Sequence, residues 1–421
     1  MKNHAMKARK ALIERMQDNS TALLYSGSAP HKSLDQDYAY IAQRNFFYLT
    51  NISDPNLILL MLKSGGKTKT FLFIEENTKH IIQWEGARMT KSEASEKSGI
   101  PETAILYTKQ FEALFNQTMN YARSVMGTPP KTLYLDLYHP DAKRKPHGLI
   151  YAGSLLENYP ELKIKNINKH LSYLRMFKTE EELAMIRSAI GHTQKGLERI
   201  MKSLSTRQNE FELQADFIHE ITLSGSEGTA FDTIAANGKN ATVLHYVENK
   251  DILNKDNMIL FDLGALHGNY ASDISRTYPL SGTYSKRQKE LYTIVLKVNK
   301  ETIKQVRPGQ TWAELNRFAK DMLTKEALKA GVIDKPEEIT EVYYHSIGHF
   351  MGLDVHDVGH YNLPLKEGMV LTIEPGLYVK KEGIGIRIED DILVTKDGHE
   401  NLSSAIPKEA DELETLIQNK Q

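Results

Sequence analysis

The 421-residue chain contains no cysteine. Disulfide bonds, thiolate metal sites and a cysteine nucleophile are therefore excluded, and the absence fits a reducing compartment. No apolar run approaches the roughly 18 residues that a membrane helix needs, and the N-terminus Met1-Lys-Asn-His-Ala5 lacks the apolar segment of a secretion signal. We therefore expect a soluble, cytoplasmic protein that has no membrane partner.

An excess of charge of one sign is also lacking. The 53 Lys and Arg residues are balanced by 54 Asp and Glu residues, for a net charge of −1. This balance gives no general attraction to nucleic acid or to anionic membranes, and we expect neither as a partner. Hydrophobic residues make up 40% of the chain, which is ample for buried cores, and the length predicts two or three domains.

Residues 1–175 mix short apolar runs with amphipathic patterns, and they predict an α/β domain with a mixed sheet. Strands are expected at 22–25, 57–62, 70–74 and 132–136, and helices at 7–17 and 110–125. No glycine-rich phosphate-binding loop occurs in this part. Trp84 is either an exposed functional aromatic or a core anchor, and the pattern by itself favours the core.

Near residues 175–179 the pattern changes to long helices, which predicts a second domain over 176–421. Ser or Thr followed three residues later by Glu or Gln marks expected helix starts at Thr179, Ser205, Ser285 and Thr311. The helices should end near 204, 223, 306 and 330. Each pair of helices precedes a strand hairpin, so the order repeats after roughly 110 residues. Two such halves placed face to face would bring their hairpins to a shared centre.

Five residues between Met258 and Asp391 are candidate metal ligands. They are Asp262, Asp273, His349, Glu374 and Glu389. Four carboxylates with one imidazole suit Mn²⁺ or Mg²⁺, and also Zn²⁺ or Co²⁺. Four carboxylates in one pocket would repel one another strongly unless cations lay between them. We therefore predict that two ions share the pocket and activate a water molecule.

Counting residues across the two expected hairpins supports the grouping of these acids. A two-residue turn at His267-Gly268 would place Asp262 directly opposite Asp273. A loop centred on residues 380–383 would likewise place Glu374 opposite Glu389. Facing like charges destabilise a sheet unless something neutralises them. A single Asp at a strand end is usually a solvated cap, so the metal hypothesis depends on this repetition of the facing pair.

The segment 343–360 carries four histidines, among them His345, His349 and His356. Its glycines argue against a continuous helix and suit a backbone that approaches a site closely. The alternative is a polar surface loop with incidental histidines. His245 follows an apolar run and could equally be structural. Arg387 lies two residues before Glu389, hence on the same face of a strand, where it could orient that carboxylate or form a surface ion pair.

These segments resemble the pita-bread metallopeptidases and, within them, the aminopeptidase P (Xaa-Pro aminopeptidase) family. The resemblance covers nearly the whole chain. It rests on Asp262 with Asp273, His345-Ser-Ile-Gly-His349, Val355-His-Asp357, Glu374-Pro-Gly376, Arg387-Ile-Glu389 and, more loosely, on Phe46-Phe-Tyr-Leu-Thr50 and Trp84 with Gly86 and Arg88. It implies an α/β (α+β) chain in which a mixed-sheet creatinase/prolidase-like domain precedes a pita-bread catalytic domain with a pseudo-twofold repeat.

The resemblance also implies the roles of the site residues. Two Mn²⁺ ions, with Co²⁺ or Zn²⁺ as alternatives, would be bridged by Asp273 and Glu389. Asp262 would complete the shell of one ion, and His349 and Glu374 that of the other. The remaining implied residues are His245, His345 and His356 for substrate binding and proton handling, Arg387 behind the ligands, Tyr378 beside the site, and Trp84, which in similar proteins reaches the site of a neighbouring subunit. A homodimer or homotetramer is therefore expected, with the N-terminal domain serving oligomerisation and substrate access.

The implied activity is removal of the N-terminal residue from peptides that have proline in second position. Glu374 is the candidate for taking the proton of the water and passing it to the departing amine. His356 and Trp84 are candidates for lining the proline pocket. The main alternative is a Xaa-Pro dipeptidase (prolidase) on the same fold, which shares all five ligands. Less favoured are a methionine aminopeptidase, a metal-free peptide-binding relative and a structural Ca²⁺ site.

Overall fold

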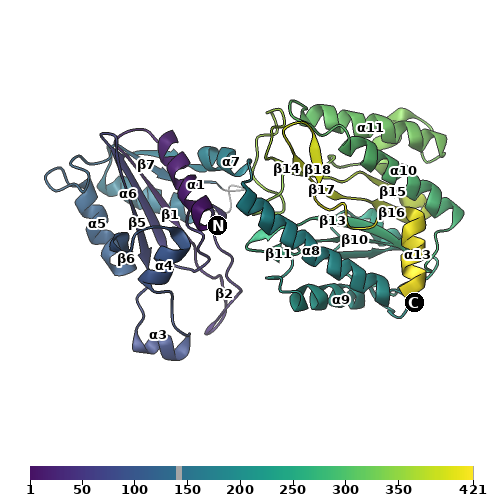
Figure 1. Cartoon of the computed structure of the whole chain (residues 1–421), viewed down its shortest axis with the longest axis horizontal. Helices are drawn as coiled ribbons and strands as arrows, with labels where there is room; N and C mark the ends of the chain where they lie inside the picture. The colour runs from purple at the N-terminus through teal and green to yellow at the C-terminus, as the bar shows by residue number, and fades with distance from the viewer. Residues whose placement is uncertain (139–144, 421) are drawn as a thin grey trace. The chain divides into compact units, whose positions relative to one another are not determined.

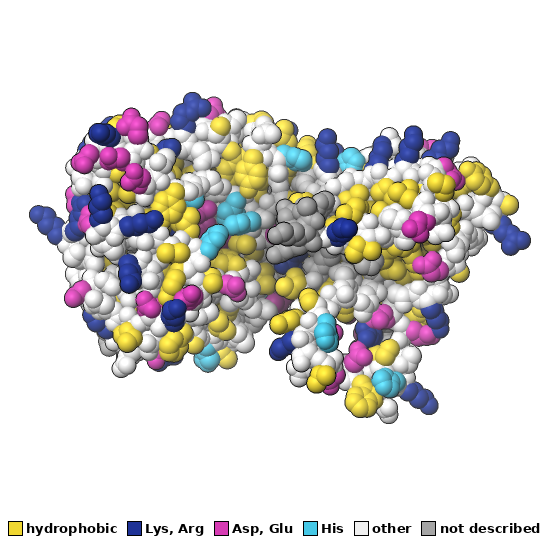
Figure 2. Space-filling model, turned by 180° about the vertical axis from the view of Figure 1, so that it is seen from behind, with side chains coloured by type: hydrophobic (Ala, Val, Ile, Leu, Met, Phe, Trp, Pro, Cys, Tyr) yellow, Lys and Arg dark blue, Asp and Glu magenta, His cyan; other side chains and the backbone are white. Residues whose placement is uncertain are grey.

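The computed structural model describes residues 1–138 and 145–420. The chain forms two compact units, Met1–Arg175 and Met176–Gln421, and each has its own sheets and helices (Figure 1). Within the described residues, no helix is long and apolar enough to cross a membrane. On the face drawn in Figure 2, Lys and Arg side chains are interspersed with Asp and Glu side chains, as the balanced composition suggests.

The helices of the first unit are short. They are α1 (Lys2–Arg15), α2 (Arg44–Thr50), α3 (Lys79–Trp84), α4 (Lys91–Ser98), α5 (Phe111–Met119), α6 (His147–Asn158) and α7 (Asn168–Arg175), with 3-10 turns at Glu102–Ala104 and Thr108–Gln110. The strands are β1 (Ser20–Tyr25), β2 (His31–Ser33), β3 (Gln36–Asp37), β4 (Ile58–Ser64), β5 (Lys67–Ile74), β6 (Ile105–Tyr107), β7 (Thr132–Leu135) and β8 (Lys163–Asn166).

The main sheet of this unit has the strand order β6-β5-β4-β1-β7-β8. Strand β1 pairs antiparallel with β4 and parallel with β7, so the sheet is mixed, as predicted. Alternate strand residues such as Leu23, Leu60 and Leu133 pack with α5 and α6 in one buried cluster. Figure 1 shows α1 and α4 in front of this sheet.

Trp84 does not anchor the core. It ends the six-residue helix α3, which has no buried residue, and its side chain is 78% exposed. The ring stacks on His80 of the same helix at a centroid distance of 5.7 Å. The core interpretation of Trp84 was therefore wrong, because aromatic character alone does not tell which surface a side chain covers.

The second unit contains longer helices and several small sheets. The helices are α8 (Glu180–Ser203), α9 (Glu210–Leu223), α10 (Lys286–Ile303), α11 (Trp312–Lys329), α12 (Ile339–Val342) and α13 (Ala410–Lys420), with 3-10 turns at Gly238–Thr242, Pro336–Glu338 and Lys380–Glu382. The strands are β9 (Ile234–Asn237), β10 (Met258–Leu263), β11 (Leu266–His267), β12 (Tyr270–Ala271), β13 (Ile274–Pro279), β14 (Val370–Ile373), β15 (Gly376–Val379), β16 (Ile384–Arg387), β17 (Asp390–Val394) and β18 (His399–Asn401).

Capping explains where these helices begin. Thr179, Ser285 and Thr311 each accept the backbone N–H three residues on, so α8, α10 and α11 start where predicted. The start predicted at Ser205 was wrong. Helix α9 is capped by Asn209, because the carboxylate of Glu212 accepts the backbone N–H groups of both residue 208 and residue 209.

The predicted order of two helices followed by a hairpin occurs twice in this unit. Helices α8 and α9 contact β9, β11 and β12, whereas α10 contacts β14, β15 and β16. Figure 1 shows the strands between these two helix pairs, with α13 crossing the end of the unit. The two hairpins, β10–β13 and β14–β17, thus meet in the middle of the second unit, where β13 contacts β16 and β17.

Candidate metal centre

A cavity of about 350 Å³ lies in the second unit. All five predicted metal ligands line it, together with His245, His345, His356 and Arg387. The other lining residues are Leu244, Trp312, Asn316, Ser346, Gly348 and Tyr361. Side chains that are more than a hundred residues apart in the chain therefore converge on one space.

The first hairpin delivers its two acids in a register that differs from the prediction. Strands β10 and β13 pair Asp262 with Ser275, not with Asp273. The turn lies at Gly268 and Asn269, one residue later than predicted, and both residues have positive φ angles of 57° and 67°. This pattern fits a type I′ turn, which needs positive φ at both central positions. The prediction had not used the tolerance of Asn for this conformation.

The second hairpin keeps the predicted register. Val370 pairs with Leu393 and Gly376 with Arg387, and the same register places Glu374 opposite Glu389. Neither acid belongs to a strand, however, because the ladder is interrupted between Ile373 and Gly376.

At this interruption the backbone N–H groups of both acids form hydrogen bonds with other segments of the chain. The backbone N–H of Glu374 donates to Ile347 O at 2.8 Å, and that of Glu389 donates to Ser275 O at 3.1 Å. The first bond ties the second hairpin to the histidine segment, and the second ties it to the first hairpin. Backbone pairing therefore brings the three ligand-bearing segments together.

His349 presents one ring nitrogen to the cavity. Its Nδ1 lies 3.1 Å from Phe350 O, to which it can donate, so Nε2 is left for the cavity. Nε2 lies 3.3 Å from Asp273 Oδ2 and 3.8 Å from Glu374 Oε1. The preceding Gly348 is required by close approach, since a Cβ there would lie 2.0 Å from Thr372 O. The glycine-rich segment is thus irregular, as predicted, and presses against β14.

The four carboxylates of the cavity are buried or half-buried, without enough positive charge to balance them. Burial, and then the charge of Glu389, raises the pKa of Asp273 and of Glu374 well above the ordinary values. Burial, followed by the charge of Asp262, raises the pKa of Glu389 to about 7. Of the described residues that line the cavity, only Arg387 carries a permanent positive charge.

The donor atoms fit divalent cations. Asp262 Oδ1 and Asp273 Oδ1 are buried and have no hydrogen-bond partner among the described residues. One ligand atom from each of Asp273, His349 and Glu389 lies within 4.8 Å of the others. Four carboxylates and one imidazole are the hard-oxygen set that Mn²⁺ prefers and that Zn²⁺ and Co²⁺ accept. Cations would neutralise the charge and take up the unpaired oxygens.

Arg387 holds one oxygen of an acid and reaches a second acid through a hydroxyl. Its Nη2 donates to Asp262 Oδ2 at 2.6 Å, and its Nε donates to Ser275 Oγ at 2.8 Å. Ser275 Oγ in turn donates to Glu389 Oε2 at 2.8 Å. Burial alone would lower the pKa of Arg387, but Tyr378 and the surrounding acids outweigh it and raise the pKa. The guanidinium therefore orients two carboxylates while leaving an oxygen of each for another ligand.

Two histidines of the cavity are held neutral. Burial and then Arg387 lower the pKa of His345 to about 4, and burial and then His349 lower the pKa of His356 to about 4. His345 Nε2 lies 2.8 Å from the hydroxyl of Tyr378, which accepts from Arg387 Nη1 at 3.0 Å. Tyr378 is fully buried and lies behind the cavity, not on its wall.

Sequence reasoning missed several residues of this region. Asp391 is fully buried and its Oδ2 accepts the backbone N–H of Asp273 at 3.2 Å. The run of three acids at 389–391 was a usable signal, because alternation on a strand puts Asp391 on the same face as Glu389. Trp312 and Tyr361, which form one aromatic group with Phe350, have no comparable signal.

Comparisons with known proteins agree with this geometry. Residues 184–396 match the model of metallopeptidase family M24, and residues 5–126 match that of the aminopeptidase P N-terminal domain. The chain is 31% identical over 431 residues to the Xaa-Pro aminopeptidase of Escherichia coli K12, which covers 97% of this chain and 96% of the relative.

Solved structures extend the likeness to the whole chain. A structure assigned as an aminopeptidase P from Bacillus anthracis is 41% identical, with a TM-score of 0.96 over 100% of this chain and 99% of the other. Zn-substituted E. coli aminopeptidase P in complex with product is 28% identical, with a TM-score of 0.90 over 100% and 99% of the two chains. The expected fold, an aminopeptidase P N-terminal domain followed by an M24 domain, is confirmed. This chain belongs to metallopeptidase family M24.

Proposed function

We propose that this metallopeptidase removes the N-terminal residue from peptides with proline in second position. One observation carries the proposal: four carboxylates and one imidazole converge on a single cavity with too little positive charge to balance them. The full-length similarity to Xaa-Pro aminopeptidases supports the substrate class. The ligand set is Asp262, Asp273, His349, Glu374 and Glu389, and we propose two ions, with Mn²⁺ as the metal expected.

Bound divalent cations would supply a Lewis acid for the peptide carbonyl and a water of lowered pKa at neutral pH. The other steps belong to side chains. Glu374 has a raised pKa and stands at the cavity wall, so it can take up a proton and hand it to the departing amine at the same carboxylate. His345 Nδ1 lies 3.8 Å from Glu374 Oε2, close enough to influence that proton.

The bond before proline has no N–H, so its recognition depends on shape. Leu244, Trp312 and Tyr361 offer apolar wall to a ring, and His245 and His356 offer nitrogen atoms that hydrogen-bond without carrying charge when neutral. Burial keeps His356 neutral at pH 7, since its pKa is about 4. Such a wall would exclude water from the scissile bond and hold the proline ring.

A peptide panel tests the activity. Purified protein loaded with Mn²⁺ should cleave Xaa-Pro-Yaa tripeptides best, Xaa-Ala-Yaa and Met-Ala-Yaa peptides poorly, and should lose activity after chelation. Preference for Xaa-Ala-Yaa over Xaa-Pro-Yaa, or full activity after exhaustive chelation, would refute the proposal. The prolidase alternative is not favoured, because the similarity to Xaa-Pro aminopeptidases spans both units. Faster turnover of Xaa-Pro dipeptides than of tripeptides would revive it.

We further propose that the N-terminal unit serves assembly into a homodimer or homotetramer and that Trp84 contributes to substrate binding there. The support is its exposed ring, which stacks on His80 within a helix that has no buried residue. Trp84→Ala should leave stability within about 0.5 kcal/mol but raise KM for Xaa-Pro-Yaa peptides. Light scattering would give the oligomeric state, and unchanged KM and preference would remove Trp84 from the site. The cytoplasmic location stays a prediction.

A further inference from the structure

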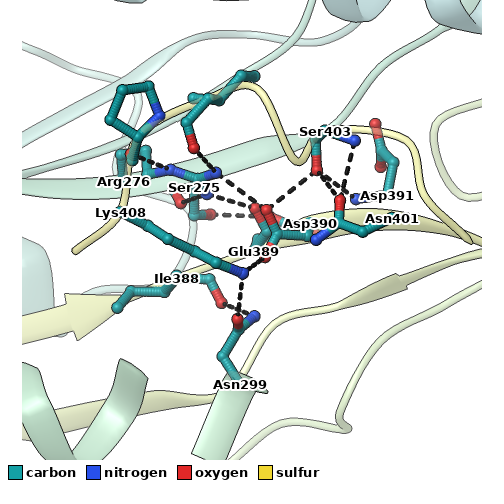
Figure 3. A network of polar contacts seen from close by, with 12 residues as sticks. Ser275, Arg276, Asn299, Ile388, Glu389, Asp390, Asp391, Asn401, Ser403 and Lys408 are labelled. Atoms are coloured by element: carbon teal, nitrogen blue, oxygen red, sulfur yellow. Dashed lines mark hydrogen bonds and ion pairs between the residues drawn. The ribbon is translucent and has the colours of Figure 1, made fainter. Parts of the chain in front are cut away.

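Behind the cavity, a buried polar network holds the two segments that carry Glu374 and Glu389. Figure 3 shows its members gathered around Asp390, with Asn299 reaching in from helix α10. Asn299 is fully buried in the last turns of that helix. Its Nδ2 donates to Ile373 O and to Ile388 O, both at 3.1 Å. These are the residues immediately before the two acids.

A proline explains why the backbone carbonyl group of Ile388 needs a hydrogen-bond donor from outside the sheet. The register places Pro375 opposite Ile388, and the N–H of Ile388 donates to Pro375 O at 3.4 Å. Proline has no N–H, so it cannot return the reciprocal bond to Ile388 O. A buried carbonyl without a partner costs about 1–3 kcal/mol. The amide of Asn299 fills that gap and joins both strands at the point where the ladder is interrupted.

Lys408 fixes the orientation of this amide. Its Nζ donates to Asn299 Oδ1 at 2.8 Å and also contacts Asp390 Oδ2. Lysine can only donate and the two carbonyls can only accept, so the amide nitrogen must face Ile373 and Ile388. On the other side, Arg276 Nη1 donates to Glu389 O at 2.6 Å. The backbone around Glu389 is thus held from two directions by side chains that do not line the cavity.

We propose that Asn299 is a positioning residue that sets the spacing between Glu374 and Glu389 and, through it, the affinity of the site for divalent cations. The inference rests on the metal site of the proposed function. Without the amide, the segments that carry Glu374 and Glu389 would lose the side chain that hydrogen-bonds to both of them. The strand pairing is interrupted at this point, so it cannot replace these two hydrogen bonds. The carboxylates would then spread over more positions, and each bound ion would have to order them again.

Two substitutions of Asn299 test the idea. Asn299→Asp keeps the size and the acceptor for Lys408 but lacks the donor, and Asn299→Ala removes both. Titration of chelator-treated protein with Mn²⁺ should show affinity weakened roughly 10- to 100-fold in either variant, the range typical for residues that support metal ligands. The electron paramagnetic resonance spectrum of the loaded protein should also show an altered coupling between the Mn²⁺ ions.

Asn237→Ala is the matched control. Asn237 is also a buried asparagine of the second unit, and its Nδ2 donates to Ile252 O at 2.9 Å while Oδ1 accepts from Asn257. It should lose stability in chelator, as Asn299→Ala does, but keep its Mn²⁺ affinity within about twofold, since no metal ligand depends on it. Affinity and coupling unchanged in the Asn299 variants, or changed equally in the control, would overturn the proposal.

Lys408→Met covers the case in which the Asn299 variants do not fold. In this variant Asp390 loses Lys408 but keeps Arg276 as a partner, and the hold on the Asn299 amide is loosened. A smaller but measurable weakening of Mn²⁺ binding is expected, and an affinity equal to that of the wild type would overturn the proposal.

Wild-type protein that binds no Mn²⁺ would overturn this inference and the proposed function together. Wild-type protein that binds Mn²⁺ but cleaves no peptide would refute the function alone, and the affinity comparison would stand.

Discussion

Two neighbouring carboxylates, Glu389 and Asp390, are both buried, yet their pKa values move in opposite directions. Burial and the charge of Asp262 raise the pKa of Glu389 to about 7. Asp390 is equally buried, but the attraction of Arg276 and Lys408 outweighs burial and lowers its pKa to about 2. Alternation along the strand turns the two side chains to opposite faces. One faces a cavity of acids and the other a pair of cations.

The partners of the two groups explain the difference. Arg276 Nη2 donates to Asp390 Oδ1 at 2.9 Å, and Ser403 Oγ donates to the same oxygen at 3.0 Å (Figure 3). Within the described residues, Asp262 and Asp273 each keep one buried oxygen without a partner. A buried charge that is paired destabilises the fold only when its partner is lost, whereas buried charges left unpaired indicate a ligand. Both arrangements occur here within the second unit.

The largest effect expected from this contrast is on activity. Asp273→Asn removes a charge and a candidate ligand oxygen from the cavity, and peptide hydrolysis with Mn²⁺ should fall on the order of a thousandfold, about 4 kcal/mol of transition-state stabilisation. In chelator the same variant should unfold at equal or higher urea concentration than wild type, because one repelling charge is gone. Activity above about a tenth of wild type, or clear destabilisation in chelator, would contradict the comparison.

Substitutions around Asp390, whose charge is paired, should change the free energy of unfolding. Arg276→Met leaves Asp390 with Lys408 and the hydroxyl of Ser403, and removal of one partner from a buried ion pair typically costs about 3–5 kcal/mol of unfolding free energy. Urea titration measures it. The double variant Arg276→Met with Asp390→Leu should recover part of the loss, since no unpaired carboxylate is then buried, although Lys408 loses its ion-pair partner. A single variant as stable as wild type would show that the pair does not hold this region.

Metal should stabilise the unpaired side in a pH-dependent way. A carboxylate whose folded pKa is raised contributes stability below its unfolded pKa and loses it as pH rises through the folded value. For Glu389 that loss ends around pH 7 to 8. Mn²⁺ displaces the protons and should raise Tm of the second unit by about 5–10 °C at a hundredfold excess over Kd. At one fixed Mn²⁺ concentration, calorimetry should show a larger increment of Tm at pH 8 than at pH 5.5, because fewer protons then compete with the metal for the carboxylates. An increment of Tm that falls as the pH rises would contradict this expectation.

The smallest effect concerns two serine hydroxyls, one on each side. Ser403→Ala removes the hydroxyl that donates to Asp390 and accepts the backbone N–H of Asp391, and it should cost about 1–2 kcal/mol of stability, with Mn²⁺ affinity unchanged. Ser275→Ala removes the hydroxyl that donates to Glu389 and should weaken Mn²⁺ binding by about tenfold. Thermal denaturation measures the stability of both variants, and metal titration measures their Mn²⁺ affinity. If stability and affinity changed to the same extent in the two variants, the contrast between Glu389 and Asp390 would be contradicted.

Much of the fold followed from local signals. Helices α8, α10 and α11 begin at capping boxes, whose residues satisfy the first free N–H groups wherever the helix lies. The register of the second hairpin followed from its loop. The first hairpin was misjudged, because the turn depends on whether Asn269 or His267 takes a left-handed conformation, and sequence spacing alone allows both. For Trp84, neither burial nor exposure could be read from its neighbours.

The donor types could be inferred from the residues alone, because four carboxylates on two hairpins and one imidazole in the segment between the hairpins suit Mn²⁺, Zn²⁺ or Co²⁺. Which acids keep oxygens free for such cations depends on long-range contacts. Glu389, Asp390 and Asp391 are adjacent acids in the chain, and they differ through partners supplied by β13, the 3-residue strand β18 with its following turn, and the C-terminal segment. Contacts between segments that are far apart in the chain set the charge around each acid. That charge distinguishes an acid that is available as a metal ligand from an acid that is held in a structural ion pair.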